Sequence, residues 1–216
     1  MSSSADAFRL IRDKLAGCPP LRIDDPKASR ASVALVLVPA RPALEILLIV
    51  RAVDPRDPWS GQVGLPGGHQ EERDKDRLAA ALRETLEETG VRLRRRDLLG
   101  ELDDLRPGWP GLPRIVIRPF VFGLSRRPAA RARAEVADVL WAGLSALESS
   151  QGTVRRSRRG KAAEVACYRA GKRAVWGITR RILGSFLERV RTTAPAQAPA
   201  RRGPSPPRPG RGARRA

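Results

Sequence analysis

The chain has 216 residues, enough for one globular domain with a terminal extension. Its hydrophobic content of 41% is sufficient for a core, and no apolar run approaches the roughly 18 residues of a bilayer-spanning helix. The single histidine, His69, excludes a metal centre built from several histidines, and Cys18 and Cys167 are far apart in the sequence. Two lone cysteines and no visible secretory signal predict a cytoplasmic protein without a membrane segment.

The net charge of +19 is concentrated in the last third of the chain. Residues 1–149 carry 24 Lys/Arg and 21 Asp/Glu, whereas residues 150–192 carry 12 and 2. Residues 193–216 contain six arginines, no acid and many prolines and alanines. Such a segment buries too little apolar surface to offset its ordering entropy, so we predict a disordered basic tail. The basic region would suit an anionic substrate or weak, nonspecific nucleic-acid binding, or it is a solvated extension without a partner.

The apolar pattern predicts an N-terminal helix and linker over 1–29, one α/β domain over 30–192, and the tail. In chain order it predicts a helix at 7–15, strands at 33–38, 44–50 and 62–65, a helix at 76–89, strands at 98–105, 115–124 and 136–141, and helices at 144–147 and 175–190. The segments 106–113 and 155–161, the second strongly basic, are predicted as loops. This order implies a mixed sheet between layers of helices.

The helix predicted at 76–89 places three carboxylates on one face. Glu84, Glu87 and Glu88 stand at positions i, i+3 and i+4, and like charges at such spacings cost a helix roughly 0.2–0.5 kcal/mol per pair. A bound cation explains the cluster, and oxygen-only ligands favour Mg²⁺ or Mn²⁺. The alternative is an exposed acidic face neutralised by Arg83 and Arg92.

Residues on either side of this helix delimit it. Asp74 or Asp76 is suited to cap its N-terminus, and Gly90 to cap its C-terminus. Gly67 and Gly68 are interpreted as a loop whose backbone approaches a ligand closely, with an ordinary turn as the alternative.

A set of residues around this helix follows a recognisable order: Gly68, Arg83, Glu84, Glu87, Glu88, Gly90 and Val91. The order resembles the Nudix box of the Nudix hydrolases, whose fold is an α/β/α sandwich with a mixed β-sheet. Three features depart from the standard box. The gap between Gly68 and Arg83 is one residue longer, Asp74 stands about where a glutamate is usual, and Thr85 fills an apolar slot. The longer gap with an aspartate resembles the coenzyme A pyrophosphatase-like branch.

The resemblance implies a role for each matching residue. Glu84, Glu87 and Glu88 would bind Mg²⁺ or Mn²⁺, and Glu84 and Glu87 would be catalytic as well. Arg83 would orient a carboxylate through a contact at i+4, unless it is simply an exposed helix arginine. Glu135, which precedes a predicted strand, is a candidate general base, and a surface glutamate is the alternative.

Residues before the box bear on the substrate. Residues 57–68 and 175–183 are similar to segments of coenzyme A pyrophosphatase-like proteins, and the upstream signature at 47–52 retains Arg51. Arg51, Gly67 and Gly68 are therefore predicted to bind substrate. Ala52 stands where a serine is expected and Trp59 where a histidine is usual. Trp59 and Trp109 either stack on a base or pack against the protein.

The resemblance implies hydrolysis of a pyrophosphate bond in a nucleoside diphosphate-linked metabolite, with coenzyme A or acyl-coenzyme A as the leading substrate. ADP-ribose, NADH and dinucleoside polyphosphates are the alternatives. A different hypothesis is a Nudix-fold binding module that associates with nucleic acid through its basic C-terminal region. The chain is expected to be a monomer or a homodimer.

Overall fold

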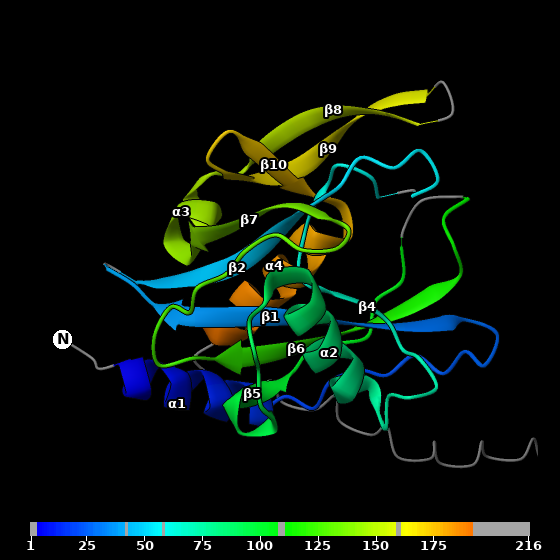
Figure 1. Ribbon diagram of the computed structural model, residues 1–216. Helices are drawn as coiled ribbons and strands as arrows, with labels where there is room; N and C mark the ends of the chain where they lie inside the picture. Colours follow the sequence, from blue (N-terminus) through cyan, green and yellow to red (C-terminus); the bar gives the residue numbers. More distant parts are fainter. Residues whose placement is uncertain (1–3, 42, 58, 108–110, 159–160, 192–216) are drawn as a thin grey trace, which may run out of the picture.

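The computed structural model describes residues 4–41, 43–57, 59–107, 111–158 and 161–191. These residues form a mixed sheet flanked by helices, which confirms the predicted α/β class (Figure 1). The predicted tail at 193–216 lies outside the described residues. No helix of the described part is long and apolar enough to cross a membrane.

The main sheet has the order β3-β2-β1-β6-β5, with β4 paired to β1 and β7 paired to β2. Its strands are β1 (Ser29–Pro39), β2 (Leu44–Arg51), β3 (Val63–Gly64), β4 (Gly67–His69), β5 (Leu98–Glu101), β6 (Ile115–Gly123) and β7 (Val136–Gly143). The β1–β6 pair is parallel and the other pairs are antiparallel, so the sheet is mixed as predicted. The parallel pair places residues 86 positions apart in the chain next to each other, for example Ser29 and Ile115.

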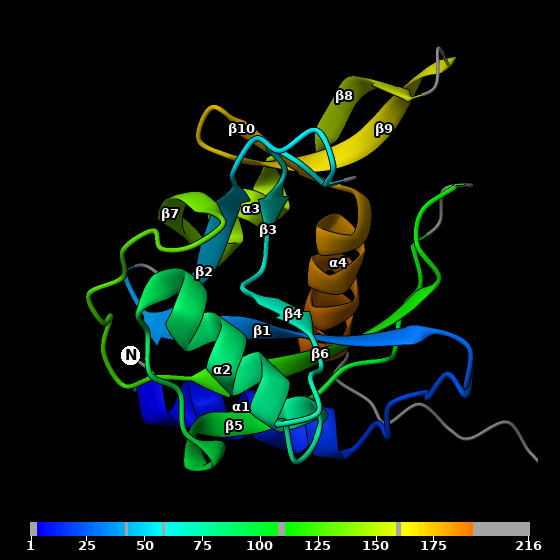
Figure 2. The ribbon, with the colours of Figure 1, turned by 45° about the vertical axis from the view of Figure 1, so that its right-hand side comes forward.

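Helices cover both faces of this sheet. They are α1 (Ser4–Ala16), α2 (Arg77–Thr89), α3 (Leu144–Ser149) and α4 (Gly177–Arg191), with a 3₁₀ turn, η1, at Arg95–Asp97. Helix α2 lies on one face, and α1 and α4 lie on the other (Figures 1 and 2). The central residues of β1 and β2 are fully buried, as their continuous aliphatic runs predict: Leu35, Val36, Leu37, Ile46, Leu47 and Leu48.

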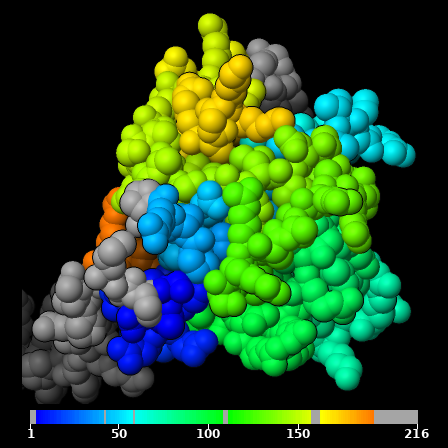
Figure 3. Space-filling model, turned by 60° about the vertical axis from the view of Figure 1, so that its left-hand side comes forward, coloured from blue at the N-terminus to red at the C-terminus, as the bar shows by residue number. Residues whose placement is uncertain are grey.

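The predicted basic loop at 155–161 is wrong for residues 155–158 and 161, which lie in strands of a second, three-stranded sheet, while residues 159–160 lie outside the described residues. Its antiparallel strands are β8 (Gly152–Arg158), β9 (Lys161–Ala170) and β10 (Arg173–Trp176). Arg155 lies directly opposite Glu164, a favourable cross-strand charge pair, and the Arg156 guanidinium stacks over the Trp176 ring. These two consecutive arginines point to opposite faces of the strand, and each has a neighbour there on another strand. In the space-filling view this sheet forms the top of the molecule, above α1 (Figure 3).

Other boundaries also differ from the prediction, and β1, for example, begins at Ser29 and not at 33. The closing helix begins at Gly177 and not at 175, because residues 173–176 pair with β9 and Gly177 turns the chain with φ 64°. The strand predicted at 98–105 ends at Glu101, and beyond it only Leu105 bridges to Ile117.

A buried ion network joins the N-terminal segment to the sheet. The Asp104 side chain is 0% exposed and accepts hydrogen bonds from Arg118 Nε at 2.8 Å and Nη2 at 3.0 Å. The backbone N–H of Ile23 donates to the same carboxylate at 3.2 Å. Burial alone would raise the pKa of Asp104, but the hydrogen bonds from Arg118 and Ile23 outweigh it, and the pKa lies below its ordinary value.

Replacing Asp104 by asparagine is expected to lower the free energy of unfolding by about 3–5 kcal/mol at neutral pH, because the partly buried arginines around it lose the counter-charge of a fully buried carboxylate. The carboxylate's contribution is present above its unfolded pKa of about 3.9 and is lost as the pH falls through the lower folded value. Urea unfolding at neutral and acidic pH measures both effects. The control is Asp138→Asn, whose pair with Arg173 is about half exposed and contributes roughly 1 kcal/mol or less. Equal losses in the two variants would contradict the prediction.

Candidate active site

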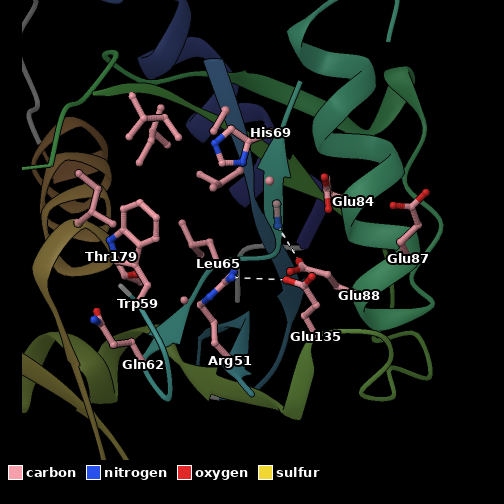
Figure 4. Close-up of a pocket in the computed structure, with 18 of the residues that line it drawn as sticks. Arg51, Trp59, Gln62, Leu65, His69, Glu84, Glu87, Glu88, Glu135 and Thr179 are labelled. Carbon is pink, nitrogen blue, oxygen red and sulfur yellow. Dashed lines mark hydrogen bonds and ion pairs between the residues drawn. The ribbon is translucent and has the colours of Figure 1, made fainter. Parts of the chain in front are cut away.

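A cavity of about 470 Å³ lies between α2 and α4. Carboxylates from α2 line one end, and α4 with Trp59 lines the other (Figure 4). Every residue predicted to belong to the site lines this cavity: Arg51, Gly67, Gly68, Arg83, Glu84, Glu87, Glu88 and Glu135. The fold thus brings together residues separated by more than 80 positions in the chain, such as Arg51 and Glu135.

The three carboxylates of α2 face the cavity at different depths. Glu88 is buried with 6% exposure, the Glu84 side chain is 18% exposed, and that of Glu87 is 44% exposed. The helix presents them in this way because its ends are fixed. Asp76 caps the N-terminus by accepting from the Ala79 N–H at 2.7 Å, and Gly90 caps the C-terminus with φ 72°.

Thr85, which fills an apolar slot of the motif, is completely buried. Its hydroxyl donates to the Ala81 carbonyl one turn earlier at 2.7 Å, so a polar side chain is accommodated without an unpaired group.

Arg83 connects the carboxylates of the cavity to one another. Its Nη1 donates to Glu84 at 2.9 Å and to Glu87 at 3.0 Å. Its Nε and Nη2 form a two-pronged contact with Asp74, at 3.1 and 2.9 Å. The hydrogen bonds to Asp74, foremost among several carboxylates, raise the pKa of Arg83, so the guanidinium is permanently charged. Asp74 is therefore the partner of Arg83, and Asp76 alone provides the side-chain cap.

Glu88 is held by the backbone of β4. Its Oε2 accepts a hydrogen bond from the Gly67 N–H at 2.8 Å (Figure 4). Burial raises the pKa of Glu88 to about 7, although the bond from Gly67 acts in the opposite direction. Burial also raises the pKa of Glu84. Two desolvated carboxylates side by side make a site that favours a cation.

The two glycines lie in a short strand and not in a loop, because β4 pairs with β1 from Ala31 to Val33. Gly67 has φ 146°, and a Cβ there would lie 2.2 Å from the Ser32 carbonyl oxygen. A Cβ on Gly68 would lie 2.5 Å from Glu84 Oε1. Only glycine allows this strand to lie against both β1 and the carboxylates of α2.

Arg51 and Glu135 meet at the edge of the cavity. Arg51 Nε donates to Asp57 at 2.7 Å, and its Nη2 lies 3.7 Å from Glu135 Oε2. The Glu135 side chain is 83% exposed, and the residue before it, Ala134, has φ 49°. The backbone N–H of Ala52 fixes Glu135 through a hydrogen bond to its carbonyl at 2.8 Å. The structure therefore pairs these two residues, a contact that their sequence positions do not reveal.

Several lining residues have no signal in the sequence. Branched aliphatic side chains form the end of the cavity near α4: Ile115, Ile117, Ile178 and Ile182. They look like ordinary core positions, and only the packing of α4 beside β6 brings them to the cavity. Trp59 and the exposed His69 also line it, whereas Trp109 lies outside the described residues.

The donor set of the acidic end fits a hard divalent cation. Its groups are carboxylate oxygens from one helix, and Gly68 leaves space beside Glu84 that a Cβ would fill. Within the described ranges, no three His, Cys, Asp or Glu side chains already converge as a metal cluster. At this end of the cavity Arg83 donates hydrogen bonds to both Glu84 and Glu87.

The fold and cavity define an α/β protein with one acidic helix facing a glycine strand. The NUDIX domain family matches residues 28–163. The Nudix hydrolase NudL of Photorhabdus laumondii, itself uncharacterized, is 32% identical over 176 residues, covering 80% of this chain and 90% of that protein. The chain therefore belongs to the Nudix family, and the predicted enzyme class of Nudix hydrolase is confirmed.

Two further comparisons are more limited. An uncharacterized protein of Schizosaccharomyces pombe is 38% identical over 101 residues, which are 44% of this chain and 31% of that relative's length. The chain thus spans about a third of that protein. A crystal structure of a MutT/nudix family protein from Enterococcus faecalis has a TM-score of 0.56 and 21% identity, covering 88% of this chain and 75% of that chain. This likeness supports the fold alone.

Proposed function

We propose that the protein is a Mg²⁺- or Mn²⁺-dependent pyrophosphohydrolase that cleaves a nucleoside diphosphate-linked metabolite, with coenzyme A or an acyl-coenzyme A as the leading substrate. The observation that carries the proposal is the placement of Glu84, Glu87 and Glu88 on one wall of the cavity, opposite the glycine strand. ADP-ribose, NADH and dinucleoside polyphosphates are the alternative substrates of the same chemistry.

In this proposal Glu84, Glu87 and Glu88 hold the ions, with Glu88 oriented by the Gly67 N–H. Bound divalent cations neutralise diphosphate oxygens and acidify an attacking water. Arg83 positions Glu84 and Glu87 and is itself fixed by Asp74. Gly67 and Gly68 bind substrate through the backbone of β4, and the missing side chain of Gly68 keeps the space beside Glu84 open.

Arg51 and Glu135 have complementary roles at the edge of the cavity. Glu135 is the candidate acceptor of the water proton, because its carboxylate is exposed to solvent and lies beside Arg51. Arg51 binds a substrate phosphate. Its guanidinium also contacts Asp57 and lies beside Glu135, so the phosphate shares it with these two carboxylates. The basic tail remains a proposed site of weak nucleic-acid binding, and the protein acts as a monomer or homodimer.

Addition of Mg²⁺ or Mn²⁺ is expected to stabilise the folded protein, because ions that neutralise the α2 carboxylates bind only the native arrangement. At an ion concentration about 100 times the Kd, the gain is about 2.7 kcal/mol, or roughly 5–10 °C in Tm. Thermal unfolding with and without each ion measures it. Glu84→Gln should lose most of the shift, whereas Glu72→Gln, which removes an exposed carboxylate outside the cavity, should retain it. Identical shifts in the two variants would argue against a metal site at α2.

The catalytic proposal is tested by release of products from coenzyme A, acyl-coenzyme A, ADP-ribose, NADH and diadenosine polyphosphates with each ion. Metal-dependent cleavage of one compound at its diphosphate identifies the substrate class. Absence of cleavage for all of them would count against the proposed hydrolase and direct attention to nucleic-acid binding.

A further inference from the structure

The cavity has two ends of opposite chemistry. All the carboxylates that line it stand at the α2 end or its edge: Glu71, Glu84, Glu87, Glu88 and Glu135. At the α4 end the lining is mainly branched aliphatic residues from β6 and α4, with Trp59, Gln62 and Thr179 beside them (Figure 4). A substrate that reaches both ends must therefore be charged at one end and apolar at the other.

The aliphatic residues at the α4 end of the cavity also belong to the hydrophobic core. Ile115, Ile117 and Ile182 are between 1% and 7% exposed and belong to the core cluster that α4 completes. Ile178 and Trp59 pack against the same cluster and remain partly exposed. A ligand group placed here removes apolar surface from water on several sides, which is favourable by roughly 25 cal/mol per Å².

The cations that line the described cavity are already committed to carboxylates. Arg83 contacts Asp74, Glu84 and Glu87, as shown above. Arg51 contacts Asp57 and Glu135. None of these contacts directs a guanidinium toward the isoleucines of β6 and α4. A second anionic group of the substrate would lose hydration at that end without gaining a counter-charge.

We infer that the α4 end of the cavity is a specificity subsite for an uncharged, largely apolar group attached to the diphosphate, with Ile178 and Trp59 as the residues that determine which groups fit. This inference rests on the proposed function and specifies its substrate class. An acyl chain and a nucleobase share the required chemistry. A cavity of about 470 Å³ is within the usual range for sites that bind small organic ligands.

The test replaces Ile178 by tryptophan to fill the subsite, with Val190→Trp as the matched control. Both residues are partly buried aliphatics on α4, and Val190 does not line the cavity. kcat/KM is measured for coenzyme A thioesters of increasing chain length and for diphosphate sugars that carry different bases. In Ile178→Trp, kcat/KM for substrates with a large apolar group is expected to fall by about tenfold or more relative to kcat/KM for the smallest substrate. Changes in the size of an apolar pocket typically have effects of this order.

Each outcome has a distinct meaning. Discrimination along the thioester series identifies the acyl chain as the occupant, and discrimination among bases identifies the nucleobase. Hydrolysis that is unchanged in Ile178→Trp relative to Val190→Trp would overturn the subsite and leave the proposed function standing. If no compound is hydrolysed, the proposed function fails, and calorimetric binding of the same compounds in metal-free buffer tests the subsite. Equal affinities for both variants would then overturn it as well.

Discussion

Glu88→Gln is expected to reduce diphosphate hydrolysis by more than about 100-fold, because Glu88 is a proposed metal ligand. Loss of a group that only supports a metal ligand costs about 10–100-fold, and loss of a ligand should cost more. The amide oxygen still accepts from the Gly67 N–H, so the side chain retains its place in the fold. A neutral group replaces a buried carboxylate that forms no ion pair with any arginine or lysine in the described part of the chain. The free energy of unfolding should therefore be unchanged or higher. Steady-state rates with saturating Mg²⁺ and urea unfolding measure the two effects.

Glu72→Gln is the control for this substitution, since it removes the same charge from an exposed residue near the helix. It should leave both the rate and the stability unchanged. Two results would contradict our assignment of Glu88. One is an activity loss of similar size in Glu72→Gln, and the other is a Glu88→Gln variant that keeps full activity.

Alanine substitution of two adjacent glycines is expected to affect different properties. Gly67→Ala should lower mainly the stability, and Gly68→Ala mainly the activity. In Gly67→Ala the Cβ would meet the backbone of Ser32 at 2.2 Å, and φ 146° is unfavourable for any other residue. Backbone strain and overpacking each cost about 1–3 kcal/mol, so this variant should be destabilised by roughly 2–6 kcal/mol. In Gly68→Ala the three atoms nearest to the Cβ all belong to the Glu84 carboxylate, the nearest at 2.5 Å, and we expect that side chain to move aside.

Gly68→Ala should therefore lose about 10–100-fold in activity through misplacement of Glu84, with a stability change of about 1 kcal/mol or less. Gly152→Ala is the control, since a Cβ there would meet nothing within 4 Å. Urea unfolding and kcat/KM are measured for all three variants. A Gly68→Ala variant with normal kcat/KM would show that the position of Glu84 does not matter for catalysis.

Local rules account for the parts of the fold that were predicted correctly. The continuous aliphatic runs of β1 and β2 predict strands buried on both faces, and both are buried. The caps of α2 follow from Asp76 and Gly90, whose side chain and backbone act within one turn. The hairpin of β8 and β9 was missed because the neighbours of the β8 arginines lie on later strands: Glu164 on β9 lies opposite Arg155, and Trp176 on β10 lies beneath Arg156.

The sequence by itself determined that Glu84, Glu87 and Glu88 share one face, because helical periodicity is a property of neighbouring residues. It also determined the family, since the order of glycines, arginine and acids is local. Tertiary structure alone decided that the Gly67 N–H binds Glu88 and that Arg51 lies beside Glu135. It also placed the isoleucines of β6 and α4 at one end of the cavity. These contacts join segments from different strands and helices, and no periodicity along the chain encodes which segments will meet.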